Sequence, residues 1–189
     1  MKKRTQKHYD TLASAMADRV IVKLWRQSIN EDKQAGYVVG LSKTWVLLQE
    51  IEGDTFVLDG YKAMRLAHVS SLKADSSFAG EYFLRRGLFP QAQPDLDLTD
   101  LHSLLDSVSE NYAMFMIERE KEEPGIGFIG VAEGLTKRSL WMRKFSSKAK
   151  WIGTEKFKLK DITSINFGGG YVNALIWMDT QAQEAVTEE

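Results

Sequence analysis

The stretch Leu58-Asp-Gly-Tyr-Lys-Ala-Met-Arg-Leu-Ala-His-Val-Ser-Ser-Leu72 recurs 93 positions further along the chain as Trp151-Ile-Gly-Thr-Glu-Lys-Phe-Lys-Leu-Lys-Asp-Ile-Thr-Ser-Ile165. Both stretches place a glycine third, a serine fourteenth, and apolar residues at the seventh, ninth, twelfth and fifteenth positions. Self-similarity at a fixed spacing is the signature of a duplicated unit. We therefore predict that the chain contains two related copies of one fold.

Further blocks extend this repeat toward the N-terminus of each copy. The blocks are Val22-Lys-Leu-Trp-Arg26 with Phe115-Met-Ile-Glu-Arg119 at spacing 93, Val38-Val-Gly-Leu41 with Phe128-Ile-Gly-Val131 at spacing 90, and Leu47 with Leu140 at spacing 93. The change of spacing predicts that the second copy has a turn three residues shorter.

Each copy begins with helical spacing and then changes to alternation. Tyr9, Leu12 and Met16 predict a helix over residues 5–17, and the apolar residues after the N-cap candidate Thr99 predict another. Strands are expected near 20–25, 36–42, 44–51, 56–66 and 68–72, and near 112–120, 125–132, 138–145, 154–160 and 162–167. A helix followed by five short, bent strands predicts a small closed barrel, because closure removes free edges.

The repeat and its punctuation divide the chain into four segments. We predict a first barrel with its helix at 1–75, a helical connector at 76–97, a second barrel with its helix at 98–179, and a flexible tail at 180–189. The connector helix is expected to end at Gly87, and residues 90–94 mark the junction. Residues 171–178 fit either a helix or a strand.

A structural turn or bulge is predicted inside the long fourth strand of each copy. It involves Asp59 and Gly60 in the first copy and Gly153 in the second, since glycine permits tight turns and close strand approach. Asp59 and Tyr61 could alternatively line a groove between the copies.

Several of these segments resemble an uncharacterised group of bacterial proteins with duplicated Sm-like (SH3-like barrel) domains. The segments are Ala35-Gly-Tyr-Val-Val-Gly-Leu-Ser-Lys-Thr-Trp-Val-Leu-Leu48, Phe56-Val-Leu-Asp-Gly-Tyr61, Arg65-Leu-Ala-His-Val69 and Asp161-Ile-Thr-Ser-Ile-Asn-Phe-Gly-Gly-Gly-Tyr171. The resemblance implies a mainly β, β-rich α+β fold: two tandem five-stranded barrels, each preceded by a helix, packed as a pseudo-dimer.

The same resemblance carries little information about activity. RNA-binding Sm proteins place an Asp and an Asn around the second turn and an Arg-Gly pair after the fourth strand. Here Ser42 and Val46 occupy the first two places, and the later pair is missing. The resemblance therefore does not imply uridine recognition of the usual kind.

Composition excludes several classes of protein. The chain has 189 residues, 11% aromatic residues, a net charge of −1 and no cysteine. These values exclude a disordered chain, a disulfide scaffold and a cysteine-ligated metal site. The basic start is followed by polar residues where a signal peptide would be apolar, and no apolar run has the ~18 residues of a membrane span. We expect a cytoplasmic protein without membrane contact.

Catalytic and cofactor signals are weak. His8, His68 and His102 lie in different expected elements and lack metal-ligand spacing. Gly125-Ile-Gly-Phe-Ile-Gly130 matches a dinucleotide-binding pattern, but no alternating strand and helix context follows it. We therefore expect no enzyme activity, no cofactor and no metal.

The strongest functional signal is a basic region with interleaved aromatic residues in the second copy. Its candidate contacts for nucleic acid or a partner are Lys137, Arg138, Trp141, Arg143, Lys148, Lys150, Trp151, Lys156 and Lys158. Cations neutralise phosphates while aromatic rings stack on bases, as in single-strand binders. However, Lys156, Lys158 and Lys160 alternate with apolar residues, which also fits the solvated face of an edge strand protected from pairing.

These observations leave three hypotheses. The first is a non-enzymatic binding or assembly module that engages a protein partner, or a second copy, through barrel edges. The second is RNA or single-stranded nucleic-acid binding by the basic second barrel. The third is a toxin-immunity-type protein, which small size and the lack of catalytic motifs favour.

Overall fold

The computed structural model describes residues 3–90 and 94–187, which form a mainly β fold. Its α-helices are α1 (Lys3–Ala17), α2 (Phe78–Arg86), α3 (Leu101–Asn111) and α4 (Gly170–Thr187). The strands of the first half are β1 (Ile21–Arg26), β2 (Asn30–Leu41), β3 (Trp45–Glu52), β4 (Val57–Arg65) and β5 (Ser71–Ala74). Those of the second half are β6 (Phe115–Glu118), β7 (Gly127–Leu135), β8 (Ser139–Phe145), β9 (Trp151–Lys158) and β10 (Ser164–Phe167). Short 3₁₀ helices, η1 (Leu66–His68) and η2 (Leu159–Asp161), follow β4 and β9.

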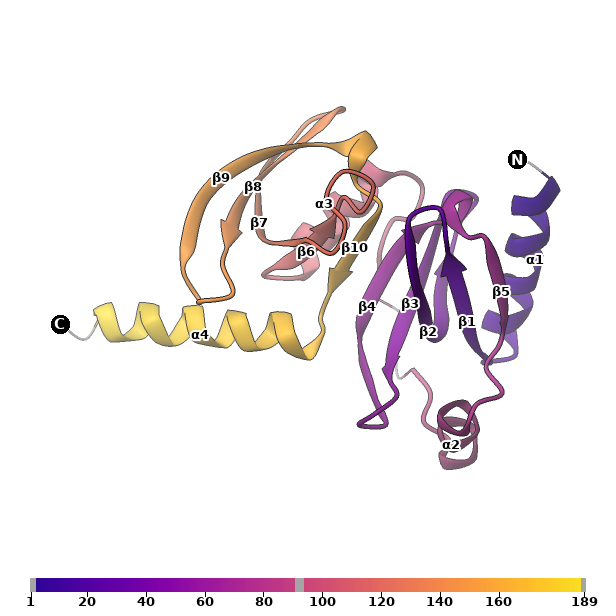
Figure 1. Cartoon of the computed structure of the whole chain (residues 1–189). Helices are drawn as coiled ribbons and strands as arrows, with labels where there is room; N and C mark the ends of the chain where they lie inside the picture. Colours follow the sequence, from indigo (N-terminus) through magenta and orange to yellow (C-terminus); the bar gives the residue numbers. More distant parts are fainter. Residues whose placement is uncertain (1–2, 91–93, 188–189) are drawn as a thin grey trace.

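All ten strands belong to one antiparallel sheet in the order β5-β1-β2-β3-β4-β10-β6-β7-β8-β9. Each half has the same internal order, with its fifth strand next to its first. Leu24 lies opposite Leu72 in one half, and Ile117 lies opposite Ile165 in the other, so the pairs are related by the spacing of 93. The two halves are joined where β4 pairs with β10, between the purple and orange parts of Figure 1.

The sheet does not close into barrels, which corrects the expectation of two closed units. In the described part of the chain, β5 and β9 each have one hydrogen-bonded neighbour and therefore one open edge. The remaining edges of the two halves, those of β4 and β10, cover each other. Pairing between the halves thus removes two of the four edges that closure would have removed.

The predicted alignment of the two copies is wrong in the second and third strands, and so is the turn expected to be three residues shorter. Gly36 lies opposite Glu50, and Gly130 lies opposite Lys144, so Gly130 corresponds to Gly36 at spacing 94. The sequence alignment instead matched Gly130 with Gly40. Both copies carry glycines four residues apart here, so a shifted alignment also matches a glycine.

A similar error of one residue affects the third strand. Val46 lies opposite Met64, whereas Leu140 lies opposite Phe157. Leu140 therefore corresponds to Val46, and the expected match with Leu47 is wrong. The bulges in β2 and β7 lie at equivalent positions and therefore do not cause these shifts. The spacing is 93 for β1 and β6, 94 for β2 and β7 and for β3 and β8, and 93 again for β4 and β9. The connection before β7 is thus one residue longer than its counterpart before β2, and the turn after β8 is one residue shorter than the turn after β3.

The hydrophobic core is shared between the halves. One cluster of buried residues lies inside the first half and includes Leu12 of α1. A larger cluster combines Trp45 and Ala63 of the first half with Ile162 and Ile165 of the second. The outer face of the first half is therefore covered by the second half and by the connector.

Local signals explain where the helices between and after the sheets begin and end. Gly87 ends α2 with a positive φ of 63°, as the sequence predicts. The N-cap of α3 is Asp100, whose carboxylate accepts from the amide of Ser103 at 3.0 Å, so the expected cap at Thr99 is wrong by one residue. Of the junction expected at residues 90–94, residues 91–93 lie outside the described residues.

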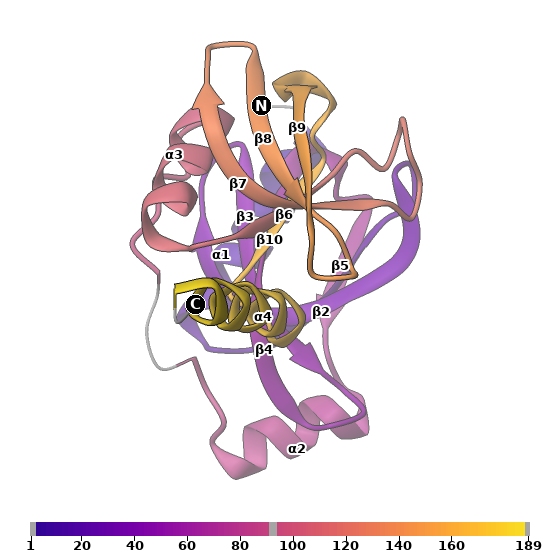
Figure 2. The same ribbon diagram turned by 90° about the vertical axis from the view of Figure 1, so that its left-hand side faces the viewer.

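The last segment is a helix, which decides between the two alternatives left open for residues 171–178. The flexible tail expected at 180–189 is helical to Thr187. Val172 and Leu175 bury one face of α4 beside the turn between β8 and β9, and Trp151 Nε1 donates to Asp179 at 2.9 Å. Figure 2 shows α4 nearly end-on beneath this turn.

The predicted turn residues lie where the chain after β10 crosses β4. Asp59 accepts a hydrogen bond from the amide of Gly170 at 2.8 Å. A Cβ on Gly60 would lie 2.3 Å from the amide nitrogen of Gly169, so this close approach requires glycine. Gly153 has a φ of 96°, and a Cβ on this residue would meet no atom within 4 Å.

We expect Gly60→Ala to destabilise the fold by about 1–3 kcal/mol, because the new methyl group must push the halves apart. Gly53→Ala is the matched control, since a Cβ there meets no atom within 4 Å. Urea unfolding of both variants measures the difference. Equal stabilities of the two variants would contradict the close approach.

Candidate functional site

Five of the basic side chains gather where β8 begins and β9 ends. In Figure 1, this end of the β8–β9 pair is the one farther from α4. Together with two other residues they line a hollow of about 650 Å³. We call this set the basic corner; its members are Lys137, Arg138, Ser139, Lys156, Lys158, Leu159 and Lys160. The five cations are exposed and, among the described residues, have no carboxylate partner.

Strand pairing explains why these residues meet. Ser139 begins β8 directly opposite Lys158. The amide of Leu159 donates to the carbonyl of Arg138 at 2.9 Å and holds η2 against the turn before β8. Trp141 lies beside the corner with 42% of its surface exposed, and Lys156 Nζ lies 5.2 Å from its ring centroid.

The other predicted contact residues lie elsewhere. Arg143 pairs with Glu133 at 3.3 Å and covers the ring of Trp151, which is half-buried. Lys148 and Lys150 lie in the turn beyond the opposite end of β8, which at 3.3 Å per residue is about 20 Å away. The predicted region therefore divides into a corner and a separate turn.

Sequence reasoning did not select Ser139 or Lys160 as site residues. Lys160 continues the alternation of lysines through the end of β9 into η2. Ser139 becomes informative only when the register is known, because it then corresponds to the bulky Trp45 of the first half.

The corresponding corner of the first half is occupied by the second half. Trp45 lies opposite Arg65, whose guanidinium lies 5.0 Å from the indole centroid. Arg65 donates from Nε to the carbonyl of Ile162 at 3.1 Å and from Nη2 to that of Leu159 at 3.2 Å. This corner therefore binds main-chain carbonyl groups.

A second main-chain contact closes the same corner from another side. The hydroxyl of Thr44 donates to the carbonyl of Thr99, which directly precedes the N-cap of α3, at 3.1 Å. Both contacts place polypeptide backbone over the end of β3 and β4.

The two corners differ in size and charge. The correspondences, first half to second, are Lys43 to Lys137, Thr44 to Arg138, Trp45 to Ser139, Ala63 to Lys156, Arg65 to Lys158, Leu66 to Leu159 and Ala67 to Lys160. Serine in place of tryptophan opens the hollow, and three more cations stand where the first half has uncharged side chains. The first corner is therefore a closed contact, whereas the basic corner is an open cationic surface.

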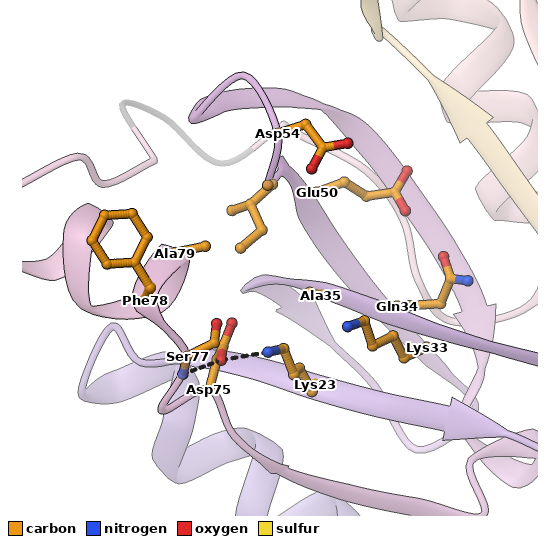
Figure 3. Close-up of a pocket in the computed structure, with 12 residues that line it drawn as sticks. Lys23, Lys33, Gln34, Ala35, Glu50, Asp54, Asp75, Ser77, Phe78 and Ala79 are labelled. Atoms are coloured by element: carbon orange, nitrogen blue, oxygen red, sulfur yellow. Dashed lines mark hydrogen bonds and ion pairs between the residues drawn. The ribbon is translucent and has the colours of Figure 1, made fainter.

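A second hollow, of about 420 Å³, lies in the first half between β1, β2, β3 and α2 (Figure 3). There Lys23 pairs with Asp75 at 2.7 Å, and the amide of Ser77 donates to the same carboxylate at 2.8 Å. Burial raises the pKa of Glu50, which lines this hollow. Its charges are mixed and partly paired, so it has less preference for a charged ligand than the basic corner.

No family model, curated protein or solved structure matches this chain. Within residues 3–90 and 94–187, no helix is both long and apolar enough to cross a membrane. The same residues contain no group of three or more metal-ligating side chains. The basic corner is the candidate site because it combines a hollow with five exposed side chains of one charge.

His68 lies in η1 at the junction of the halves and provides a test of that junction. Burial, and then the positive charges of Lys121, Arg65 and Arg26, lower its pKa to about 4. The folded chain therefore keeps this imidazole neutral at pH values where the unfolded chain, with an ordinary pKa of 6.5, binds a proton. Its contribution to stability is present above pH 6.5 and is lost as the pH falls toward 4.

We expect His68→Gln to flatten the loss of stability between pH 7 and pH 5, because glutamine does not titrate. Urea unfolding at both pH values measures this slope. The same loss in the variant and the unmodified chain would show that His68 does not cause it.

Proposed function

We propose that this chain is a non-enzymatic binding module of Sm-like architecture, with two open, barrel-like halves packed as a pseudo-dimer. Its partner is a protein that adds a strand to the free edge of β9. One observation carries the proposal: within the molecule, β10 is added to the edge of β4, and β9 is the equivalent strand of the second half. The chain thus contains an example of the proposed contact.

The exposure of β9 supports this mode of binding. Ile152, Gly153 and Thr154 are exposed, and among the described elements only β8 pairs with the strand. An edge strand presents a row of unpaired main-chain donors and acceptors, which an extended peptide can match. The hollow of the basic corner lies at the end of this edge and supplies a place for side chains of the partner.

Selection of peptides from a random display library against the full chain tests the proposal. We expect the enriched peptides to slow amide hydrogen exchange in residues 151–158, because new main-chain hydrogen bonds protect those amides. Residues 71–74 of the other edge strand serve as the internal control. Protection confined to other elements, or no enrichment, would argue against strand addition at β9.

A second candidate function is binding of single-stranded nucleic acid, which the exposed ring of Trp141 beside unpaired cations favours. Stacking of a base on this ring, with phosphates in the basic corner, would use both features. Titration with oligonucleotides at two salt concentrations measures this activity. Salt-sensitive affinity that Trp141→Ala reduces supports it, and no binding at micromolar protein excludes it.

A further inference from the structure

We infer that the segment bound at β9 is acidic: an extended peptide whose carboxylates lie in the basic corner. This inference rests on the proposed function and adds the chemistry of the partner. It follows from a comparison of two corners that share their main-chain geometry and differ in their side chains.

The corner of the first half binds polypeptide backbone. Arg65 binds the carbonyls of Leu159 and Ile162, and Thr44 binds the carbonyl of Thr99. Only a polypeptide offers both these carbonyl acceptors and the alternating groups that pair with a strand edge. A peptide is therefore favoured over a nucleic acid as the occupant of the corresponding place in the second half.

The charges of the basic corner indicate which side chains such a peptide must carry. Arg138 and Lys158 replace Thr44 and Arg65, and within the described chain their side chains have no acceptor of their own. Lys137, Lys156 and Lys160 add three further charges around the hollow. Repulsion among five cations is relieved best by carboxylates, which also accept their hydrogen bonds.

A second copy of this chain fits the open edge poorly. In the contact within the molecule, Ala63 lies opposite Ile165, and both are fully buried. The repeat spacing of 93 would place Lys156 opposite Leu72 of a second copy in the same register. That arrangement buries an ammonium group against an apolar side chain, which is costly without a partner.

Charge gives a second argument against self-association. The open edge of β5 carries Lys73, and the neighbouring helix α1 carries further basic residues and, within its described span, one acidic residue. Both free edges are thus cationic, and like charges across an interface disfavour contact. An acidic partner is not repelled by these cationic edges.

Two labelled peptides test the inference: an eight-residue peptide alternating Glu and Thr, and a matched peptide alternating Gln and Thr. We expect the acidic peptide to bind the full chain at least about tenfold more tightly at low salt. The difference is expected to shrink as salt screens the exposed charges. Hydrogen exchange of residues 151–158 locates both peptides.

Variants that place the residues of the first corner in the basic corner test whether its charge causes the preference for the acidic peptide. The triple variant Arg138→Thr, Lys156→Ala, Lys160→Ala is expected to lose the preference for the acidic peptide. The control Lys7→Ala, Lys33→Ala, Lys43→Ala removes the same charge from exposed sites outside the corner and is expected to keep the preference. Unfolding curves show whether each variant is folded.

The outcomes distinguish this inference from the proposed function. Equal affinity of both peptides at β9 would overturn the acidic partner and leave strand addition intact. If neither peptide slows exchange in β9, both fail. If light scattering shows self-association and the triple variant changes it, the occupant of the β9 edge is a second copy of this chain and not an acidic peptide. If an oligonucleotide binds and the acidic peptide does not, the ligand of the basic corner is a nucleic acid.

Discussion

Glu120→Ala is expected to destabilise the chain by about 3–5 kcal/mol, because it leaves the guanidinium of Arg26 buried without its counter-charge. Arg26 is 0% exposed and Glu120 is 3% exposed. Two hydrogen bonds of 2.7 Å join them, one to each carboxylate oxygen. Arg26 ends β1 of the first half and Glu120 follows β6 of the second, so this ion pair links the halves.

Urea unfolding checks this prediction against two other variants. Glu81→Ala breaks an exposed pair with Arg85 on α2 and is expected to cost at most about 1 kcal/mol. The double replacement Arg26→Met, Glu120→Leu removes both charges and is expected to cost less than Glu120→Ala alone. A loss as small as that of Glu81→Ala would contradict the buried link.

The ion pair of Arg26 and Glu120 also makes the stability of the fold depend on pH. Burial alone would raise the pKa of Glu120, but hydrogen bonds from Arg26 and Thr163 and the charge of Arg26 leave it below the ordinary value of 4.5. The contribution of this carboxylate is therefore fully present above pH 4.5 and is lost as the pH falls through the folded value. Glu120→Gln is expected to reduce the slope of stability in this range.

Ser139→Trp is expected to reduce affinity for the acidic peptide about tenfold or more, because an indole fills the hollow in which the carboxylates lie. The equivalent Trp45 of the first half is 1% exposed at the corresponding place on the β3–β4 pair, so this position of the fold can hold a tryptophan. Fluorescence anisotropy with the labelled peptide measures the affinity.

A matched replacement controls for the added surface of tryptophan. Ser147→Trp places the same side chain at an exposed position in the turn beyond the other end of β8 and is expected to keep the affinity. Unchanged affinity in Ser139→Trp, with a folded chain, would show that the hollow does not hold the partner.

Much of the fold follows from sequence patterns that act locally. Alternation of apolar and polar residues predicted the strands, and the spacing of 93 predicted the equivalence of the Leu24–Leu72 and Ile117–Ile165 pairs. Gly87 was a sufficient signal for the end of α2, because a left-handed residue after a helix favours glycine.

The pairing of β4 with β10 could not be predicted in the same way. Main-chain groups at a strand edge are the same in every sequence, so the choice between closing a barrel and pairing with the other half depends on tertiary packing. Ala63 and Ile165 make that packing close, and neither is distinctive in the sequence.

The candidate site was predicted in part. Charge and aromatic content identified the region of Lys137, Trp141 and Lys156, but the sequence alone could not separate the corner from the distant turn of Lys148. The role of Ser139 was hidden because connections of unequal length in the two halves displaced the alignment by one residue.

Docking of an acidic partner at the free edge of β9, with its carboxylates in the basic corner, is expected to protect the amides of that strand. Hydrogen exchange of the unmodified chain is measured with and without the peptide alternating Glu and Thr. We predict slower exchange in residues 151–158 and no change in residues 71–74. Protection at 71–74, or none at 151–158, would contradict the account.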